Sequence, residues 1–468
     1  MRSLVSSACL VAAVTACGKT PRPLSIDITT GQETDAFTAA PAVTRVDVTV
    51  SFLDKSPAVT ASAPPGGTFD LGTVTDTEQI SISVDGFDKA GAPVMHGLSL
   101  GGLPLSGISG TSVPVFIQRS LAWARPPGGL REAHVGGVAG FIGERYVTVT
   151  GGAKAAGDTS ATKPTQVDAY DLLALDGAVS QALPRAPQSL VPVGSSQLLI
   201  DAAGATWVDF SGASAPVEAA LPAGLAWSFG EVAGGATVYD ATGMRTFVVG
   251  GTRRGAATTA VLEVSDDRTL PLVGYTLLTP RKGAAATYVD AIGLVVAGGS
   301  ADPAGAGVEV LAVGAKVFSA LGYPADPVEG AGAVTDGAHG IGLLGGTSGG
   351  MAAPTRLLDA SCGMGKGCVV TAAGGATLPL PTTGVAAFRY VGTRSIVVAQ
   401  EAGGAGMTRT FLVDLSNGGT LGELPLKEPR RGATPVPTPL GTLALLGGEH
   451  PDGTPATSIE CFSPPPPP

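Results

Sequence analysis

Leu294-Val295-Val296-Ala297-Gly298-Gly299 is one of the clearest copies of a pattern that recurs along this chain. It is an apolar run that ends in two glycines, and a short run without polar alternation is typical of a strand covered on both faces. The same form recurs at 146–152, 247–251, 343–346 and 443–448, with degenerate copies at 198–202 and 396–400. The copies follow one another at intervals of about 47 to 54 residues, which predicts a repeat architecture.

Further apolar runs flank each copy. One run precedes the glycine pair, as at 283–289, and a third follows it, as at 260–264 and 308–311. A fourth ends in a turn of the form Pro184-Arg185, Pro280-Arg281 or Pro429-Arg430. Four strands per unit at this period resemble the kelch motif, although the regular Tyr and Trp of the fuller motif are missing. Over residues 112–463 the resemblance implies an all-β fold, a kelch-like β-propeller.

Seven copies predict seven blades, or six if the degenerate copy near residue 201 is an irregular insertion. The last unit ends after its third strand, at Phe462-Ser463, before the proline tail at 464–468. An open sheet edge needs a cover. We therefore predict that residues 113–119 supply the fourth strand of the last blade and close the ring.

Residues 25–110 have a different pattern. Runs at 46–50 and 79–84 alternate between apolar and polar residues, and Pro64-Pro65-Gly66-Gly67 and Asp85-Gly86 are turn signals. Alternation with period two predicts strands with one buried face. We expect a small immunoglobulin-like β-sandwich here; an irregular β linker is the alternative.

The first residues indicate export. Met1-Arg2 precedes an apolar run at 4–14, which is shorter than the roughly 20 residues of a membrane span. Val14-Thr15-Ala16-Cys17 then resembles the lipobox of bacterial lipoproteins. The resemblance implies a signal peptide at 1–16, a lipid on Cys17 and a tether at 17–24. An ordinary secretory signal with a chance cysteine is the alternative. Gly18, where an Asp would indicate inner-membrane retention, favours the outer membrane.

Three further cysteines remain after Cys9 and Cys17. Cys362 and Cys368 flank a short glycine-rich loop, and in an oxidising compartment this spacing predicts a local disulfide. A metal site is the alternative, but a single pair without a neighbouring His is a poor zinc site. We expect Cys461 to be a buried small apolar side chain.

Composition and the scattered histidines argue against several functions. The net charge of -10 and the absence of a long basic run argue against a nucleic-acid surface. The four histidines His96, His134, His339 and His450 show no metal-ligand spacing, and we expect His134 to be structural. We identify no catalytic residue, no metal site and no cofactor. A copper oxidase of the galactose-oxidase kind and a purely structural envelope protein stay open as alternatives.

Binding is the remaining function. In kelch propellers ligands usually meet the loops on one face, including those after the glycine pairs. Arg253, Arg254 and the solvent-facing His450 are the contacts that we single out in these loops. The sequence thus predicts a lipid-anchored, non-enzymatic scaffold that binds an unknown protein or envelope ligand.

Overall fold

The computed structural model describes residues 21–54, 56–75, 79–104, 112–155, 166–178, 182–211, 215–250, 257–290, 292–300, 302, 305–338, 340–359, 370–403 and 406–465. Strands dominate these residues, and the α-helix found among them is a single turn, α1 (Phe229–Val232). In this part of the chain, no helix is both long and apolar enough to span a bilayer. The all-β class that the repeat predicted is therefore confirmed.

The described residues after the N-terminal strands form seven four-stranded antiparallel sheets. The first three consist of β12 (Val138–Ile142), β13 (Tyr146–Thr150), β14 (Val167–Asp171) and β15 (Asp176–Ala178); of β16 (Ser189–Val193), β17 (Ser196–Ile200), β18 (Ala205–Asp209) and β19 (Val217–Glu218); and of β20 (Ala236–Asp240), β21 (Arg245–Val249), β22 (Thr258–Ser265) and β23 (Val273–Arg281).

The next three sheets consist of β24 (Ala285–Val289), β25 (Gly293–Ala297), β26 (Val308–Ala312) and β27 (Ser319–Leu321); of β28 (Gly332–Thr335), β29 (Gly340–Leu344), β32 (Pro354–Asp359) and β33 (Val370–Thr377); and of β34 (Thr382–Val391), β35 (Arg394–Glu401), β36 (Thr408–Asp414) and β37 (Gly419–Glu423). The seventh consists of β38 (Thr434–Pro437), β39 (Leu443–Leu446), β40 (Glu460–Ser463) and β11 (Ala122–Ala124). A two-stranded hairpin, β30 (Thr347–Ser348) with β31 (Met351–Ala352), extends the fifth unit.

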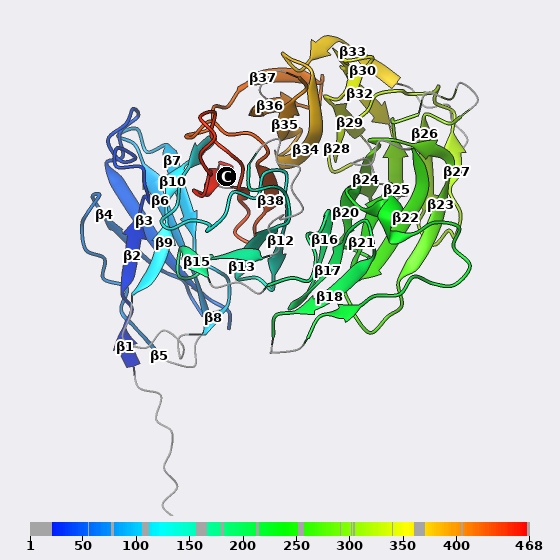
Figure 1. The fold of residues 1–468 in the computed structure, drawn as a ribbon. Coiled ribbons are helices and arrows are strands. Elements are labelled where there is room, and N and C mark those ends of the chain that lie inside the picture. Colours follow the sequence, from blue (N-terminus) through cyan, green and yellow to red (C-terminus); the bar gives the residue numbers. More distant parts are fainter. Residues whose placement is uncertain are drawn as a thin grey trace, which may run out of the picture.

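The sheets follow one another around a common centre. First strands of several successive sheets contact each other, as β24 contacts β28 and β28 contacts β34, and β12 of the first sheet also contacts β38 of the seventh. In Figure 1 these first strands lie toward the middle of the assembly and the later strands lie outside them. The arrangement is consistent with a β-propeller-like fold.

The second strand of each sheet is buried on both faces, as its unbroken apolar sequence predicts. Because successive side chains of a strand point to opposite faces, alternate residues enter different seams, a seam being the interface between two successive sheets. Leu294 and Val296 of β25 pack toward the third sheet, whereas Val295 and Ala297 pack toward the fifth. Each seam holds one apolar cluster, including the seam between the seventh and first sheets.

The glycine pairs are required where the chain leaves the second strand. Gly298 and Gly299 have φ of 75° and 72°, in the left-handed region that side chains disfavour. A Cβ on Gly299 would also lie 2.5 Å from the carbonyl oxygen of Lys282. The pair therefore allows a tight exit close to the preceding connection.

The seventh sheet is completed by an early segment, but not by the one that we predicted. β11 is antiparallel to β40, with Trp123 opposite Phe462. The prediction of residues 113–119 for this role is wrong, because β9 (Val113–Phe116) and β10 (Gln118–Arg119) pair with N-terminal strands. The physical reason is burial: Val113, Val115 and Ile117 alternate into the N-terminal core, which leaves the following strand to cover the edge.

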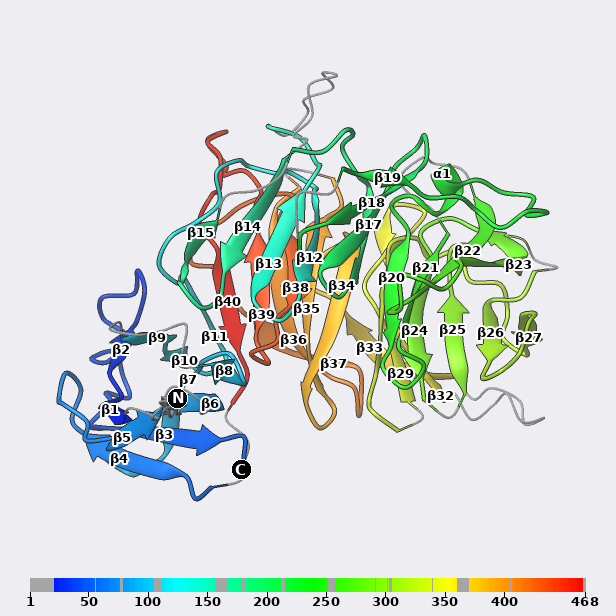
Figure 2. The ribbon, with the colours of Figure 1, turned by 90° about the horizontal axis from the view of Figure 1, so that it is seen from below.

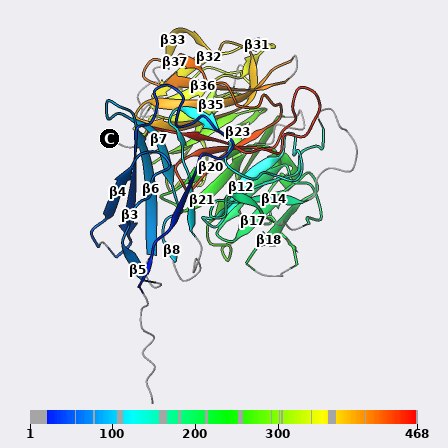
Figure 3. The same cartoon turned by 90° about the vertical axis from the view of Figure 1, so that its left-hand side faces the viewer.

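The N-terminal module, which we define as the described residues of 21–119, contains one large sheet and two small ones. β4 (Val59–Ala63), β3 (Arg45–Phe52), β6 (Gln79–Phe87), β7 (Pro93–Leu98) and β10 lie in this order, and β8 (Leu103–Pro104) pairs with β6. Several of these strands are seen side by side in Figure 3. β2 (Ile26–Thr29) pairs in parallel with β9, and β1 (Pro21–Pro23) pairs with β5 (Thr73–Thr75).

The predicted strands at 46–50 and 79–84 are confirmed as parts of β3 and β6, whose buried valines and isoleucines alternate with partly exposed residues. The predicted turn at Asp85-Gly86 is wrong, because both residues continue β6. Gly86 lies against Met95 on β7, where a Cβ would be 3.0 Å from the Met95 Cβ. This glycine serves a close approach between strands rather than a turn.

The module lies against the first and seventh sheets (Figure 2). A single apolar cluster joins Val84 and Met95 of the module to Val149 of β13 and to Leu446 and Cys461 of the seventh sheet. The module and the sheets therefore share one core. Cys461 is free and buried, as predicted.

Candidate functional site

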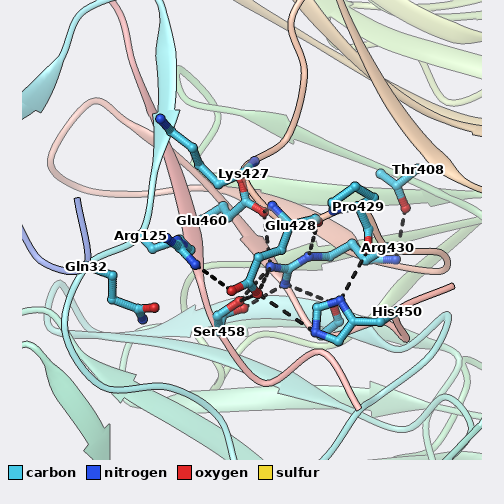
Figure 4. Close-up of polar contacts among 12 residues, drawn as sticks. Gln32, Arg125, Thr408, Lys427, Glu428, Pro429, Arg430, His450, Ser458 and Glu460 are labelled. Atoms are coloured by element: carbon cyan, nitrogen blue, oxygen red, sulfur yellow. Dashed lines mark hydrogen bonds and ion pairs between the residues drawn. The ribbon is translucent and has the colours of Figure 1, made fainter. Parts of the chain in front are cut away.

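His450 lies in the loop that follows β39, within a polar cluster shown in Figure 4. Its Nδ1 is 3.2 Å from the carbonyl oxygen of Pro429, and its Nε2 is 3.8 Å from Oε2 of Glu428. The side chain is 24% exposed, so one side of the ring meets solvent and the other meets the cluster.

Glu428 is the centre of this cluster. Its Oε1 accepts a hydrogen bond from Arg125 Nη1 at 2.6 Å, its Oε2 accepts one from the Ser458 hydroxyl, and Arg430 Nη2 is 3.3 Å from the same oxygen. Burial by itself raises the pKa of Glu428, but the hydrogen bonds from Ser458 and Arg125 and the charge of Arg430 hold it below its ordinary value. An ionised carboxylate with so many donors is a weak base.

Ser458, His450 and Glu428 have the residue types of a hydrolase triad, but their contacts do not match one. No hydrogen bond between these described residues joins the Ser458 hydroxyl to His450. The hydroxyl donates to Glu428 and accepts from Arg430 Nη2 at 2.7 Å. A nucleophile needs a base in contact with its oxygen. The cluster is therefore an ion network that holds the segment before β38.

The network also ties the module to the seventh sheet. Arg125 donates through Nε to Glu33 of the module at 2.9 Å, while its Nη1 reaches Glu428. Lys427 Nζ lies 3.7 Å from the other oxygen of Glu33. Gly31 has φ of 64° and lies against the Arg125 carbonyl, where a side chain would collide. The two ion pairs of Glu33 and the close backbone approach at Gly31 fix the module against the seventh sheet.

A carboxylate on the third strand has the same role in three sheets. Glu309 of β26 accepts the main-chain N–H groups of Leu278 and Thr279 at 2.6 and 3.1 Å, and the guanidinium of Arg281 at 2.8 Å. Both charged side chains are fully buried. The carboxylate thus holds two successive N–H groups together with the basic side chain two residues after them.

The seventh and first sheets repeat this arrangement. Glu460 of β40 accepts the N–H groups of Lys427 and Glu428 at 2.7 and 3.0 Å and pairs with Arg430 at 3.0 Å. Asp168 of β14 accepts the N–H groups of Arg131 and Glu132, both at 2.8 Å, and His134 Nε2 lies 3.4 Å from the same oxygen. His134 therefore takes the place that arginine has elsewhere, and the structural role predicted for it is confirmed.

Two other sheets carry variants of the same device. In the second, Arg185 donates to the Thr206 hydroxyl at 2.8 Å, where a carboxylate stands in the first, fourth and seventh sheets. In the fifth, the charges are exchanged, because Arg356 on β32 donates to Asp326 on the connection at 2.6 Å. The repeated arginines and acids thus stabilise the connections between sheets.

Each ring nitrogen of His134 faces an oxygen. Its Nδ1 is 3.0 Å from the carbonyl oxygen of Gly151, and its Nε2 faces Asp168. Burial by itself raises the pKa of Asp168, but hydrogen bonds from His134 and from the Glu132 and Arg131 N–H groups bring it below its ordinary value.

A cleft of about 430 Å³ lies between the first strands of the fourth to seventh sheets. It is placed where β28, β34 and β38 turn into their second strands, so it is at the opposite end of the sheets from the loops after the glycine pairs. The walls carry Phe388, Tyr390 and Phe462, with Tyr390 and Phe462 in an edge-to-face contact at 5.6 Å. The size is in the range of small-ligand sites.

Arg389 is the charged residue among the described lining residues of this cleft. Its Nη1 donates to the carbonyl oxygen of Asp336 at 2.7 Å, and its side chain is exposed. Threonine hydroxyls from Thr335, Thr438 and Thr442 complete the polar part of the lining. The cleft therefore combines one cation, several hydroxyls and three aromatic side chains, which suits an acidic group with an apolar neighbour.

The other residues predicted for function lie outside the described residues. These are the lipid-attachment residue Cys17, the disulfide candidates Cys362 and Cys368, and the loop arginines Arg253 and Arg254. The part of the chain that the structure describes contains no group of three His, Cys, Asp or Glu side chains that could hold a metal ion.

Sequence reasoning missed the carboxylates and the cleft. The Pro-Arg pairs at 280–281 and 429–430 were a usable signal, because both arginines are buried partners of a third-strand acid. No comparable sequence pattern pointed to Arg389. A comparison with models of known protein families finds no match, and a comparison with curated proteins finds no relative.

Proposed function

We propose that this chain is a lipid-anchored lipoprotein of the cell envelope, held at the outer membrane through Cys17, and that it serves as a non-enzymatic protein-binding scaffold. In this proposal the seven sheets are the blades of a kelch-like β-propeller, and the N-terminal module is a small immunoglobulin-like sandwich. The lipobox-like sequence supports the anchor, and the repeated glycine pairs support the kelch relationship.

The scaffold proposal rests on one observation: some charged side chains are buried and paired inside the sheets, whereas Arg389 is exposed in the cleft. Glu309, Glu460 and Asp168 are all buried and occupied by main-chain N–H groups and basic side chains. Arg389 in the cleft, by contrast, is exposed beside aromatic side chains. The internal charges therefore stabilise the sheets, and the cleft is the place where an acidic side chain of a partner protein would bind.

The anchor is tested by Cys17→Ser. The thiol accepts the lipid, so the variant should move from the membrane fraction to the soluble fraction of cells. Cys461→Ala is the matched control, because Cys461 is buried in the shared core and should leave the protein in the membrane fraction. Retention of Cys17→Ser in the membrane would contradict the anchor.

The scaffold is tested with the Cys17→Ser chain as bait for envelope proteins, compared with the same chain carrying Arg389→Glu. The charge reversal should remove a specific partner while leaving the unfolding transition unchanged, because Arg389 is exposed. Capture that does not depend on residue 389 would exclude the cleft as the binding site. Stoichiometric copper together with oxidase activity would refute the non-enzymatic proposal.

A further inference from the structure

Two segments of the N-terminal module are paired at one end and separated at the other. β1 is antiparallel to β5, and their register runs from Pro21 opposite Thr75 to Pro23 opposite Thr73. In Figure 1 the two strands lie side by side at the lower end of the module. Beyond Pro23 and Thr73 the ladder stops. β2 continues on one side and residues 66–72 on the other, and no strand pairing joins them among the described residues.

β2 has a free edge on the side of this opening. Its hydrogen bonds to β9 involve alternate residues, since the N–H of Val113 donates to Ser25 O at 3.0 Å and the N–H of Ile117 to Thr29 O at 2.9 Å. In a parallel pair the residues between these turn their main-chain groups the other way. Ile26 and Ile28 therefore direct an N–H and a C=O each toward the opening, where no main-chain partner is found within the described residues.

The opposite side of the opening is a strand-like segment without a partner. Residues 68–71 alternate in exposure, with Phe69 and Leu71 turned inward and Thr68 and Asp70 exposed. No hydrogen bond from the main chain of these four residues to another described strand is found. An extended, alternating segment in this state is a second open edge.

Between the two edges lies a groove of about 390 Å³. Its floor and walls are Leu24, Ile26, Ile28, Phe37, Val46, Phe69 and Leu71, with Ser25, Thr68, Gly66 and Gly67 at its rim, and none of these described residues is charged. The apolar floor would bind side chains on one face of an inserted strand, and the two edges would bind its main chain.

Two acids flank the groove on the outside. Asp27 follows Ile26 on β2 and is exposed, and Asp70 lies between Phe69 and Leu71 and is exposed as well. Because strand side chains alternate, a strand between these edges would point every second side chain outward, level with the two carboxylates. Basic side chains at those outward positions would be favoured.

We propose that this groove binds an extended segment of another protein by strand addition, with apolar side chains inward and lysine or arginine side chains outward. The segment would complete the small layer formed by β2 and β9. This site lies on the module and is separate from the Arg389 cleft, so the two proposals can fail independently.

The experiment uses the Cys17→Ser full-length chain and a fluorescein-labelled peptide, Lys-Val-Lys-Val-Lys-Val-Lys, with blocked ends. Fluorescence anisotropy at low ionic strength should show saturable binding. In hydrogen exchange, the amides of Ile26 and Ile28 should exchange rapidly in the free protein and at least about tenfold more slowly with peptide. A version of the peptide with N-methylated amides should not bind, because it cannot join a ladder.

Charge variants separate this proposal from unspecific attraction to an acidic protein. Asp27→Asn with Asp70→Asn should weaken peptide binding about tenfold at low salt, because two carboxylates near a polycation are lost. Glu144→Gln, an exposed acid in the turn between β12 and β13, should not change it. The proposal is overturned if Glu144→Gln weakens binding equally, if the N-methylated peptide binds as well, or if both amides are already protected in the free protein.

Discussion

At the scale of single residues, the same chemical problem is solved repeatedly. Each connection that enters a new sheet buries main-chain N–H groups, and a buried N–H without a partner is costly. Glu309 and Glu460 satisfy two of these groups each and balance a buried arginine. In the first sheet Asp168 is one methylene shorter, and the partner is His134 instead of arginine.

The Asp168 arrangement predicts a pH effect. The pKa of Asp168 is below its ordinary value in the folded protein, so ionised Asp168 stabilises the fold above the unfolded pKa of 3.8. This contribution is lost as the pH falls through the folded pKa. Asp168→Asn should therefore lower the free energy of unfolding by about 2 kcal/mol at neutral pH. The difference in this free energy between the variant and the unsubstituted protein should shrink below about pH 4.

Urea unfolding of both chains between pH 3 and pH 7 measures this difference in the free energy of unfolding. Asp290→Asn is the comparison, since Asp290 is exposed in the turn after β24. A gap between Asp168→Asn and the parent that stays constant down to pH 3 would show that Asp168 is not ionised in the folded state.

At the scale of elements, the second strands and β11, the fourth strand of the seventh sheet, differ in how easily they can be predicted from the sequence. A second strand is apolar throughout because it contributes to two seams, and this leaves an unbroken run. β11 is only three residues long, Ala122–Ala124, and its one large side chain is Trp123. Trp123 is fully buried, lies 5.9 Å from the ring of Phe462 and donates through Nε1 to Thr410.

Trp123→Ala tests the closing strand. The change removes an apolar side chain and a buried hydrogen bond from the seam between the sixth and seventh sheets, so it should cost about 3–5 kcal/mol. Trp207→Ala is the matched variant, because Trp207 is only partly buried at the edge of its cluster. If the two variants lose the same free energy of unfolding in urea, then β11 gives the seventh sheet no special stability.

At the scale of the whole molecule, the module and the sheets are one folded unit. The cluster that contains Met95 and Leu446 crosses their boundary, and Arg125 joins Glu33 to Glu428. A shared apolar core makes the two parts unfold together, whereas the ion pairs set their relative position.

A double-mutant cycle of Arg125→Ala and Glu33→Ala measures the link. Arg125 is 23% and Glu33 12% exposed, so the pair is partly screened by water and the coupling should be about 1 kcal/mol. Both single variants should still unfold in one transition, because the apolar core is unchanged. Additive losses, or a separate transition for the module, would show that the two parts are not coupled through this pair.

The repeat, the all-β class, the positions of the second strands and the early origin of the last sheet's fourth strand could all be predicted from the amino-acid sequence. These predictions rest on periodicity and hydropathy, which are local properties of the chain. The tertiary structure decided which early segment closes that sheet, because β9 and β11 both carry apolar residues and only packing assigns Val113 to the module and Trp123 to the seam. The Arg389 cleft and the open edge of β2 also could not be predicted from the sequence. Both depend on how strands that are distant in the chain end next to one another, and not on a pattern within any one strand.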